Sequence, residues 1–157
     1  MPPDTGMAFV VVQHLSPDFK SLMDELLGRH TGMPIHRATD GIELAPNEIY
    51  LIPPKKDLTV SDGRLILHEQ QKTRGLNLPI DSFFASLAQN VGKDAVAIVL
   101  SGSGSDGSCG AQEIHDAGGL VVVQTPDTHA LTRCHLPLLK PRSWIWFVKF
   151  TKCQITL

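Results

Sequence analysis

The sequence predicts an α/β fold with a doubly wound, mostly parallel sheet, flanking helices and a small β-hairpin. Three observations support this prediction. The short, uniformly apolar runs Ala8–Gln13, Ala95–Leu100 and Leu120–Gln124 are typical of strands that are covered on both faces. Amphipathic helical patterns lie between such runs, and strands that alternate with helices form parallel sheets. The pair Asp62-Gly63, inside the alternating segment 60–67, indicates a tight hairpin turn.

Helices are predicted at about residues 16–27, 81–92 and 107–117, where cap signals accompany the apolar residues or glycines end the segment. Ser16-Pro17 offers an N-cap followed by proline at the first helical position. Asp81 is expected to cap the second helix. Glycines follow the second and third helices, as is common at helix C-termini.

Composition limits the class of protein. A chain of 157 residues with 42% hydrophobic residues suits one soluble domain, and a net charge of −2 gives no basic surface for nucleic acid. Cys109, Cys134 and Cys153 fit no metal-ligand spacing, and their odd number argues against a disulfide framework. There is no leader pattern, and no apolar run approaches the roughly 20 residues that span a bilayer. We therefore expect a cytoplasmic protein that neither inserts into a membrane nor binds nucleic acid.

Two polar residues follow predicted strands and are the candidate catalytic pair. His14 comes directly after the first strand, and Asp106 lies in the Gly/Ser loop after the strand Ala95–Leu100. Open α/β sheets place their sites at the carboxyl ends of strands, so both side chains are expected at one crevice. His14 can act as a general base whose orientation Asp106 fixes, and backbone N–H groups at Ser103 and Gly104 can stabilise an oxyanion. No second ligand at metal spacing accompanies His14.

Other interpretations of these residues stay open. Gly102 to Gly107 matches the pattern G-x-G-x-x-G of dinucleotide-binding loops. However, Asp106 would repel a pyrophosphate, and the next strand ends on Gln124 rather than on the acidic residue that holds a ribose. A purely structural Gly/Ser turn with Asp106 as a helix N-cap is a further alternative. His14 can likewise be an ordinary histidine at a strand end.

Five stretches together resemble the catalytic domain of the chemotaxis protein-glutamate methylesterases, the CheB family. They resemble most closely the form found in methylesterase–methyltransferase fusion proteins. They cover about Met1 to Thr128 almost without a break, which makes them far more specific than any single motif. The stretches are FVVVQHLSPDFKSLMDELL, DGIELAPNEIYLIPPKKDL, RGLNLPIDSFFASLA, AIVLSGSGSDGSCG and AGGLVVVQTPDT.

The resemblance implies hydrolysis of glutamate γ-methyl esters on the cytoplasmic helices of chemoreceptors by a Ser-His-Asp triad, with release of methanol and without a metal or organic cofactor. The family's histidine, in its VVQH motif, falls on His14, and its aspartate falls on Asp106. Its backbone oxyanion donor falls on Ser103. Fused methyltransferase or regulatory domains are possible partners in a full-length protein.

The chain departs from the family pattern before His14. The family's nucleophilic serine lies in a Gly-x-Ser-x-Gly-Gly turn about two dozen residues before the histidine, whereas only thirteen residues precede His14. Ser16 belongs to a helix cap, and Ser101, Ser103 and Ser105 lie on the loop of Asp106. We therefore expect residues 1–128 to form a methylesterase domain that lacks its first strand, its nucleophile and its first helix, and to be catalytically inactive.

The segment from Arg133 to Leu157 also departs from the family. It contains both tryptophans and no acidic residue, and the family's closing phrase is absent. We hypothesise a frameshift near Thr128, which would make residues 129–157 a non-native tail. Two alternative functions for the chain are a receptor- or partner-binding fragment without catalysis and a dinucleotide-binding domain.

Overall fold

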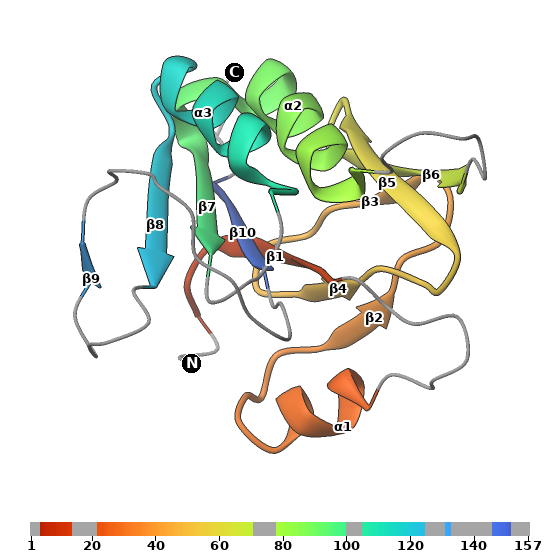
Figure 1. The fold of residues 1–157 in the computed structure, drawn as a ribbon. Helices are drawn as coiled ribbons and strands as arrows, with labels where there is room; N and C mark the ends of the chain where they lie inside the picture. The colour runs from red at the N-terminus through yellow and green to blue at the C-terminus, as the bar shows by residue number, and fades with distance from the viewer. Residues whose placement is uncertain are drawn as a thin grey trace, which may run out of the picture.

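The computed structural model describes residues 4–13, 22–70, 78–99 and 105–124, together with the backbone of 131–132 and 146–151. Its described strands form a seven-stranded and a three-stranded sheet, with helices packed around them (Figure 1). The order in the larger sheet is β2 (Ile35–Arg37), β4 (Ile49–Leu51), β1 (Met7–Val12), β10 (Trp146–Thr151), β7 (Ala95–Val99), β8 (Leu120–Gln124) and β9 (Leu131–Thr132).

The larger sheet is mostly parallel, as predicted. β4 pairs in parallel with both β1 and β2, and β7 pairs in parallel with β8. β10 is antiparallel to both of its neighbours, β1 and β7, so β1 and β7 run in the same direction. β9, at one edge of the sheet, pairs antiparallel with β8. The predicted α/β class is confirmed.

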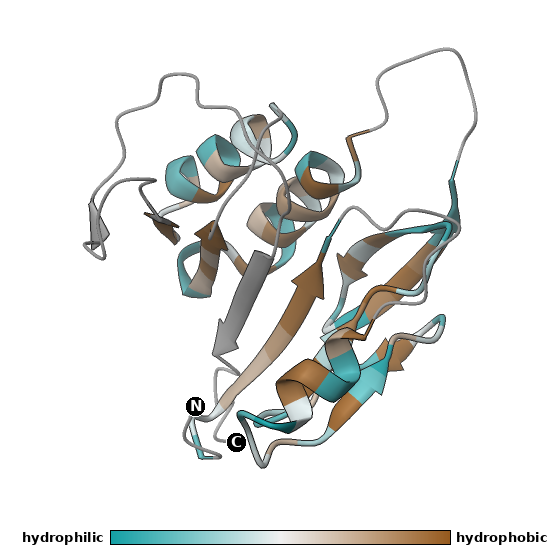
Figure 2. Ribbon diagram, turned by 60° about the horizontal axis from the view of Figure 1, so that its bottom comes forward, coloured by the Kyte–Doolittle hydropathy of each residue, from teal (hydrophilic) through white to brown (hydrophobic). Residues whose placement is uncertain are grey.

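Helices cover both faces of the sheet, and β1 shows why. Its even-numbered residues 8, 10 and 12 lie in one buried cluster with α2 (Pro79–Val91). Its odd-numbered residues Phe9 and Val11 lie in another cluster with Met23 of α1 (Met23–Gly28). A strand with two buried faces must be apolar throughout, and Figure 2 shows β1 as a largely hydrophobic strand. The doubly wound arrangement follows from this alternation.

The predicted hairpin is present and belongs to the smaller sheet. That sheet has the order β3 (Ile42–Glu43), β6 (Arg64–Glu69) and β5 (Lys56–Ser61). Asp62 and Gly63 join β5 to β6 with φ values of 48° and 72°, the two positive values that a type I′ turn requires. The hairpin is attached to α2 because the Val60 N–H donates to Ser86 Oγ at 3.0 Å.

The described helices differ from the prediction in their starting points. α2 begins at Pro79, so Asp81 is its third residue and Leu78 occupies the N-cap position; the prediction of Asp81 as the cap is wrong. The predicted cap at Ser16-Pro17 lies outside the described residues. The third helix, α3 (Ser108–Asp116), and the short 3-10 helix η1 (Gly92–Asp94) complete the described helices. None of them combines the length and apolar character that crossing a membrane requires.

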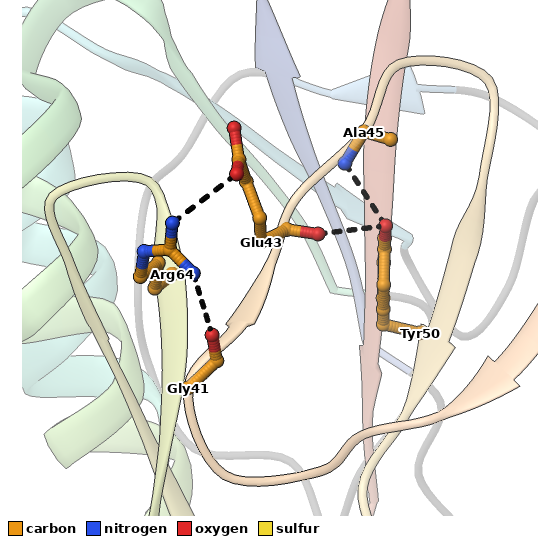
Figure 3. Close-up of polar contacts among 5 residues, drawn as sticks. All are labelled: Gly41, Glu43, Ala45, Tyr50 and Arg64. Atoms are coloured by element: carbon orange, nitrogen blue, oxygen red, sulfur yellow. Dashed lines mark hydrogen bonds and ion pairs between the residues drawn. The ribbon is translucent and has the colours of Figure 1, made fainter.

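A buried tyrosine joins the two sheets (Figure 3). The hydroxyl of Tyr50, on β4, accepts the Ala45 N–H at 2.9 Å and lies 3.2 Å from the carbonyl oxygen of Glu43, on β3. It also lies 2.7 Å from Glu48 Oε2. Arg64, on β6, donates to Gly41 O and Glu43 Oε2 from the other side. Burial, reinforced by the Glu48 carboxylate, raises the pKa of Tyr50 to about 12.

The raised pKa gives a testable pH dependence. Because the ordinary tyrosine pKa is 10.0 and the folded value is about 12, the unfolded chain loses this proton first as the pH rises. The stability that this difference provides is complete below pH 10 and is lost as the pH rises toward 12. Tyr50 is the only tyrosine in the chain, so tyrosinate absorbance reports on it alone. We expect a midpoint near 12 in the folded protein and near 10 in denaturant; a folded midpoint near 10 would contradict the described burial.

Candidate active site

The carboxyl ends of β1 and β7 lie level with each other at one edge of the sheet. Val12, the last residue of β1, and Val99, the last residue of β7, are both opposite Trp146 of β10. One strand therefore separates the two ends, a distance of about 10 Å at the usual strand spacing. The chain leaves β1 toward His14 and leaves β7 toward the Gly/Ser loop. His14, Ser103 and Gly104 themselves lie outside the described residues.

Asp106 is the candidate site residue that the structure describes. It is only 7% exposed and is the one charged residue that is buried in the described part of the chain. Its Oδ1 accepts the N–H of Asp81 at 2.9 Å, and its Oδ2 accepts the N–H of Ile80 at 3.2 Å. Both donors belong to the first turn of α2, so the carboxylate lies directly at the N-terminus of that helix.

Asp106 acts as the cap that α2 lacks. Leu78, at the N-cap position, has no side-chain oxygen, and Pro79, at the first helical position, has no N–H. The N–H groups of Ile80 and Asp81 are those that an N-cap side chain would normally satisfy. Asp106 satisfies them from a position 25 residues further along the chain.

The helix that Asp106 caps is not the one that the purely structural interpretation of the Gly/Ser loop predicts. That interpretation has Asp106 cap the helix that follows it, which is α3. In the structure α3 begins after Gly107, whose φ is 91°, and it has no side-chain cap. Asp106 instead caps α2, which precedes it in the sequence. A contact between residues so distant in the chain leaves no local pattern from which it could be predicted.

The capping bonds also fix the orientation of the carboxylate, because one N–H group donates to each of its two oxygens. The helix N-terminus also favours a negative charge at this point. A carboxylate that is held in this way is suited to orienting a histidine. Within the described residues, no group of three His, Cys, Asp or Glu side chains could hold a metal ion.

The Asp81 side chain contacts α3 instead of capping α2. Its Oδ1 accepts the N–H of Gly110, in the first turn of α3, at 2.7 Å, so its side chain bridges to another helix. The two helices approach closely here: a Cβ on Gly110 would lie 2.5 Å from the Cβ of Phe84. Only glycine fits at that position without a shift of α2 or α3.

Comparisons with known proteins give a consistent family. The family model described as CheB methylesterase matches residues 1–134. An uncharacterized 104.1 kDa protein in the hypE 3' region of Rhodobacter capsulatus is 46% identical over 104 residues, which are 66% of this chain and 11% of that protein. Protein-glutamate methylesterase/protein-glutamine glutaminase 3 of Paramagnetospirillum magneticum is 35% identical over 116 residues, which are 73% of this chain and 33% of that protein.

A solved structure extends the likeness to the fold. The crystal structure of the Thermotoga maritima CheB methylesterase catalytic domain matches with a TM-score of 0.60 and 28% sequence identity. The match covers 71% of this chain and 61% of that chain. This chain therefore spans only part of the length of the proteins that it resembles.

The capping role of Asp106 can be tested by unfolding. Asp106→Ala leaves the N–H groups of Ile80 and Asp81 without their acceptor, so we expect the free energy of unfolding to fall by about 1–3 kcal/mol. Glu113→Ala, at an exposed position on α3, is the control and should change it by less than about 0.5 kcal/mol. Urea titration measures both. Equal, small effects for the two variants would contradict the capping.

Proposed function

This chain belongs to the CheB methylesterase family, and from that premise we propose that it is the larger part of a protein-glutamate methylesterase domain. In the complete unit the reaction is hydrolysis of glutamate γ-methyl esters on chemoreceptors, which makes the domain a carboxylic ester hydrolase. The observation that carries the proposal is the level position of the two strand ends, with Asp106 held by α2 beyond one of them.

His14 and Asp106 are the proposed catalytic pair. His14 lies two positions beyond Val12 and has the same parity as residues 8, 10 and 12, which share a buried cluster with α2. Because the ends of β1 and β7 are about 10 Å apart, a histidine that follows β1 has to reach across β10 to meet Asp106. The carboxylate would then fix the imidazole tautomer and stabilise the imidazolium that forms.

The proposed reaction proceeds in two steps. A serine hydroxyl transfers its proton to His14 while its oxygen attacks the ester carbonyl, and the oxyanion is stabilised by N–H groups at Ser103 and Gly104. The imidazolium returns the proton to the departing methoxide, so methanol leaves and an acyl-enzyme remains. Water then attacks the acyl-enzyme, with His14 again as base, which releases the glutamate carboxylate and restores the serine.

We propose that the nucleophilic serine comes from a segment upstream of this chain. The strand between β1 and β7 supports this idea. β10 is the one interior strand of the described sheet that runs against both neighbours, whereas the strands on either side of it are parallel to each other. A parallel strand in that position would end at the same edge as β1 and β7. It would deliver a residue between His14 and Asp106.

The same observation bears on the end of the chain. We propose that residues 1–128 are the methylesterase domain and that residues 129–157, which include β10, are a non-native tail occupying the position of that upstream strand. Sequencing the surrounding DNA tests this assignment. A single-base change that restores the family's closing phrase is the expected result, and its absence would contradict the frameshift.

The proposed substrate also defines partners and compartment. The esters lie on the cytoplasmic helices of chemoreceptors, so the domain would act in the cytoplasm. The two relatives described above are much longer than the matched segments, which supports further domains in the full-length protein. A methyltransferase or a regulatory domain is the expected neighbour.

Methanol release from a methylated receptor tests the function. The chain alone should release no methanol above the blank, and the chain extended by a segment with the family's Gly-x-Ser-x-Gly-Gly turn should release it. In the extended protein, His14→Gln should lower the rate by a factor on the order of 10⁴ to 10⁶, and Asp106→Asn by about 10⁴.

Three outcomes would speak against this proposal. Methanol release by the unextended chain would show that no upstream serine is needed. An undiminished rate in His14→Gln would remove that residue from the mechanism. Receptor binding by the extended protein without any methanol release would favour the non-catalytic binding fragment.

A further inference from the structure

We propose that Asp81 is a positioning residue that holds Asp106 in place through both helices at the site. The inference rests on the proposed function, because the task of Asp106 there is to orient His14. Asp81 contacts the Asp106 carboxylate through its backbone and α3 through its side chain. It is the residue at which the two helix N-termini are joined.

The first contact fixes the orientation of the Asp106 carboxylate. The N–H of Asp81 donates to Oδ1, and the N–H of the preceding residue, Ile80, donates to Oδ2. Two donors from one rigid helical turn, one on each oxygen, define the plane of the carboxylate. Any rotation of the first turn of α2 would therefore turn Asp106 with it.

The second contact fixes the segment that carries Asp106. The Asp81 Oδ1 accepts the N–H of Gly110, four residues after Asp106, at 2.7 Å. Between them the chain turns tightly, with the N–H of Ser108 donating to the carbonyl oxygen of Ser105 and Gly107 accepting from Ala111. Asp106 is thus held at its carboxylate by α2, and its chain is held to α2 by the side chain of Asp81.

Close packing removes the freedom that would otherwise weaken this coupling. A Cβ on Gly110 would lie 2.9 Å from the carbonyl oxygen of Asp81 and 3.0 Å from its Cα, so the two backbones are already in contact. The two aspartates form a reciprocal arrangement. Asp106, just before α3, caps α2, and Asp81, within α2, accepts from the first turn of α3.

One oxygen of the Asp81 side chain lowers the stability of the fold. Its Oδ2 is buried and has no hydrogen-bond partner in the described part of the chain. A buried carboxylate oxygen without a donor lowers stability. The other oxygen, Oδ1, accepts the N–H of Gly110. That hydrogen bond acts on the segment that carries Asp106.

The titration of the His14 ring, followed by NMR in the full chain, tests this inference. Asp106→Asn should move the midpoint to lower pH by about one unit or more, because the imidazolium loses its carboxylate partner. Asp81→Ala and Asp81→Asn both remove one negative charge, but only the alanine variant removes the acceptor for Gly110. We expect the alanine variant to shift the midpoint clearly further than the asparagine variant, by at least half of the shift seen in Asp106→Asn.

The matched control is Ser82→Ala, at the exposed next position of the same helical turn, which should leave the midpoint unchanged. Equal shifts in Asp81→Ala and Asp81→Asn would overturn the positioning role, because charge alone would explain both. If Asp81→Ala does not fold, Asp81→Glu replaces it: the charge is kept and the contact with Gly110 is displaced, so an unchanged midpoint would overturn the role.

The two proposals fail in different ways. An unchanged midpoint in Asp106→Asn shows that His14 and Asp106 do not interact, which removes the catalytic pair and the positioning role together. A shift in Asp106→Asn combined with equal shifts in the two Asp81 variants removes the positioning role alone. The proposed function is unaffected by that second result.

Discussion

The hydrogen bonds between the Asp106 carboxylate and the first turn of α2 are the constraint on which the candidate site depends. They bring a residue that follows β7 to a helix that precedes β7 in the chain. The same hydrogen bonds cap α2 and fix the Asp106 carboxylate, because the N–H groups in the first turn of α2 that lack a partner within the helix are the ones that orient Asp106. The site is consequently as rigid as the packing of α2 against the sheet, which is made by buried side chains such as Phe83 and Leu87.

The large sheet positions the strand ends of the candidate site, because β1 and β7 share one direction. β1 and β7 are far apart in sequence, yet both run the same way and stop at the same level. The two faces of β1 pack in different clusters, so a shift of one residue would put each set of side chains into the packing made for the other. Tyr50 acts at the other side of β1, where it ties the smaller sheet to β4. Both sheets therefore contribute to the position of β1.

Sequence patterns predict the parts of this structure that repeat along the chain. The strands β1, β7 and β8, the β5–β6 hairpin and the extent of α3 follow from apolar runs and turn residues. β2, β3 and β4 escape prediction because strands of two or three residues are too short to show alternation. The hydrogen bond between Asp81 and Gly110 cannot be predicted for another reason. It joins residues 29 positions apart, and a local pattern of residue types does not indicate such a contact.

The place of β10 has a consequence for how the chain folds. β1 and its parallel neighbours form one half of the large sheet, β7 and its partners form the other, and β10 is the strand between the halves. Its pairs with β1 join residues separated by almost the whole chain, such as Met7 and Thr151. Contacts between such distant residues close slowly because of the loop entropy involved. During synthesis, the edges of β1 and β7 that face β10 would stay unpaired until residue 151 has left the ribosome. In that interval, edge-to-edge aggregation competes with folding.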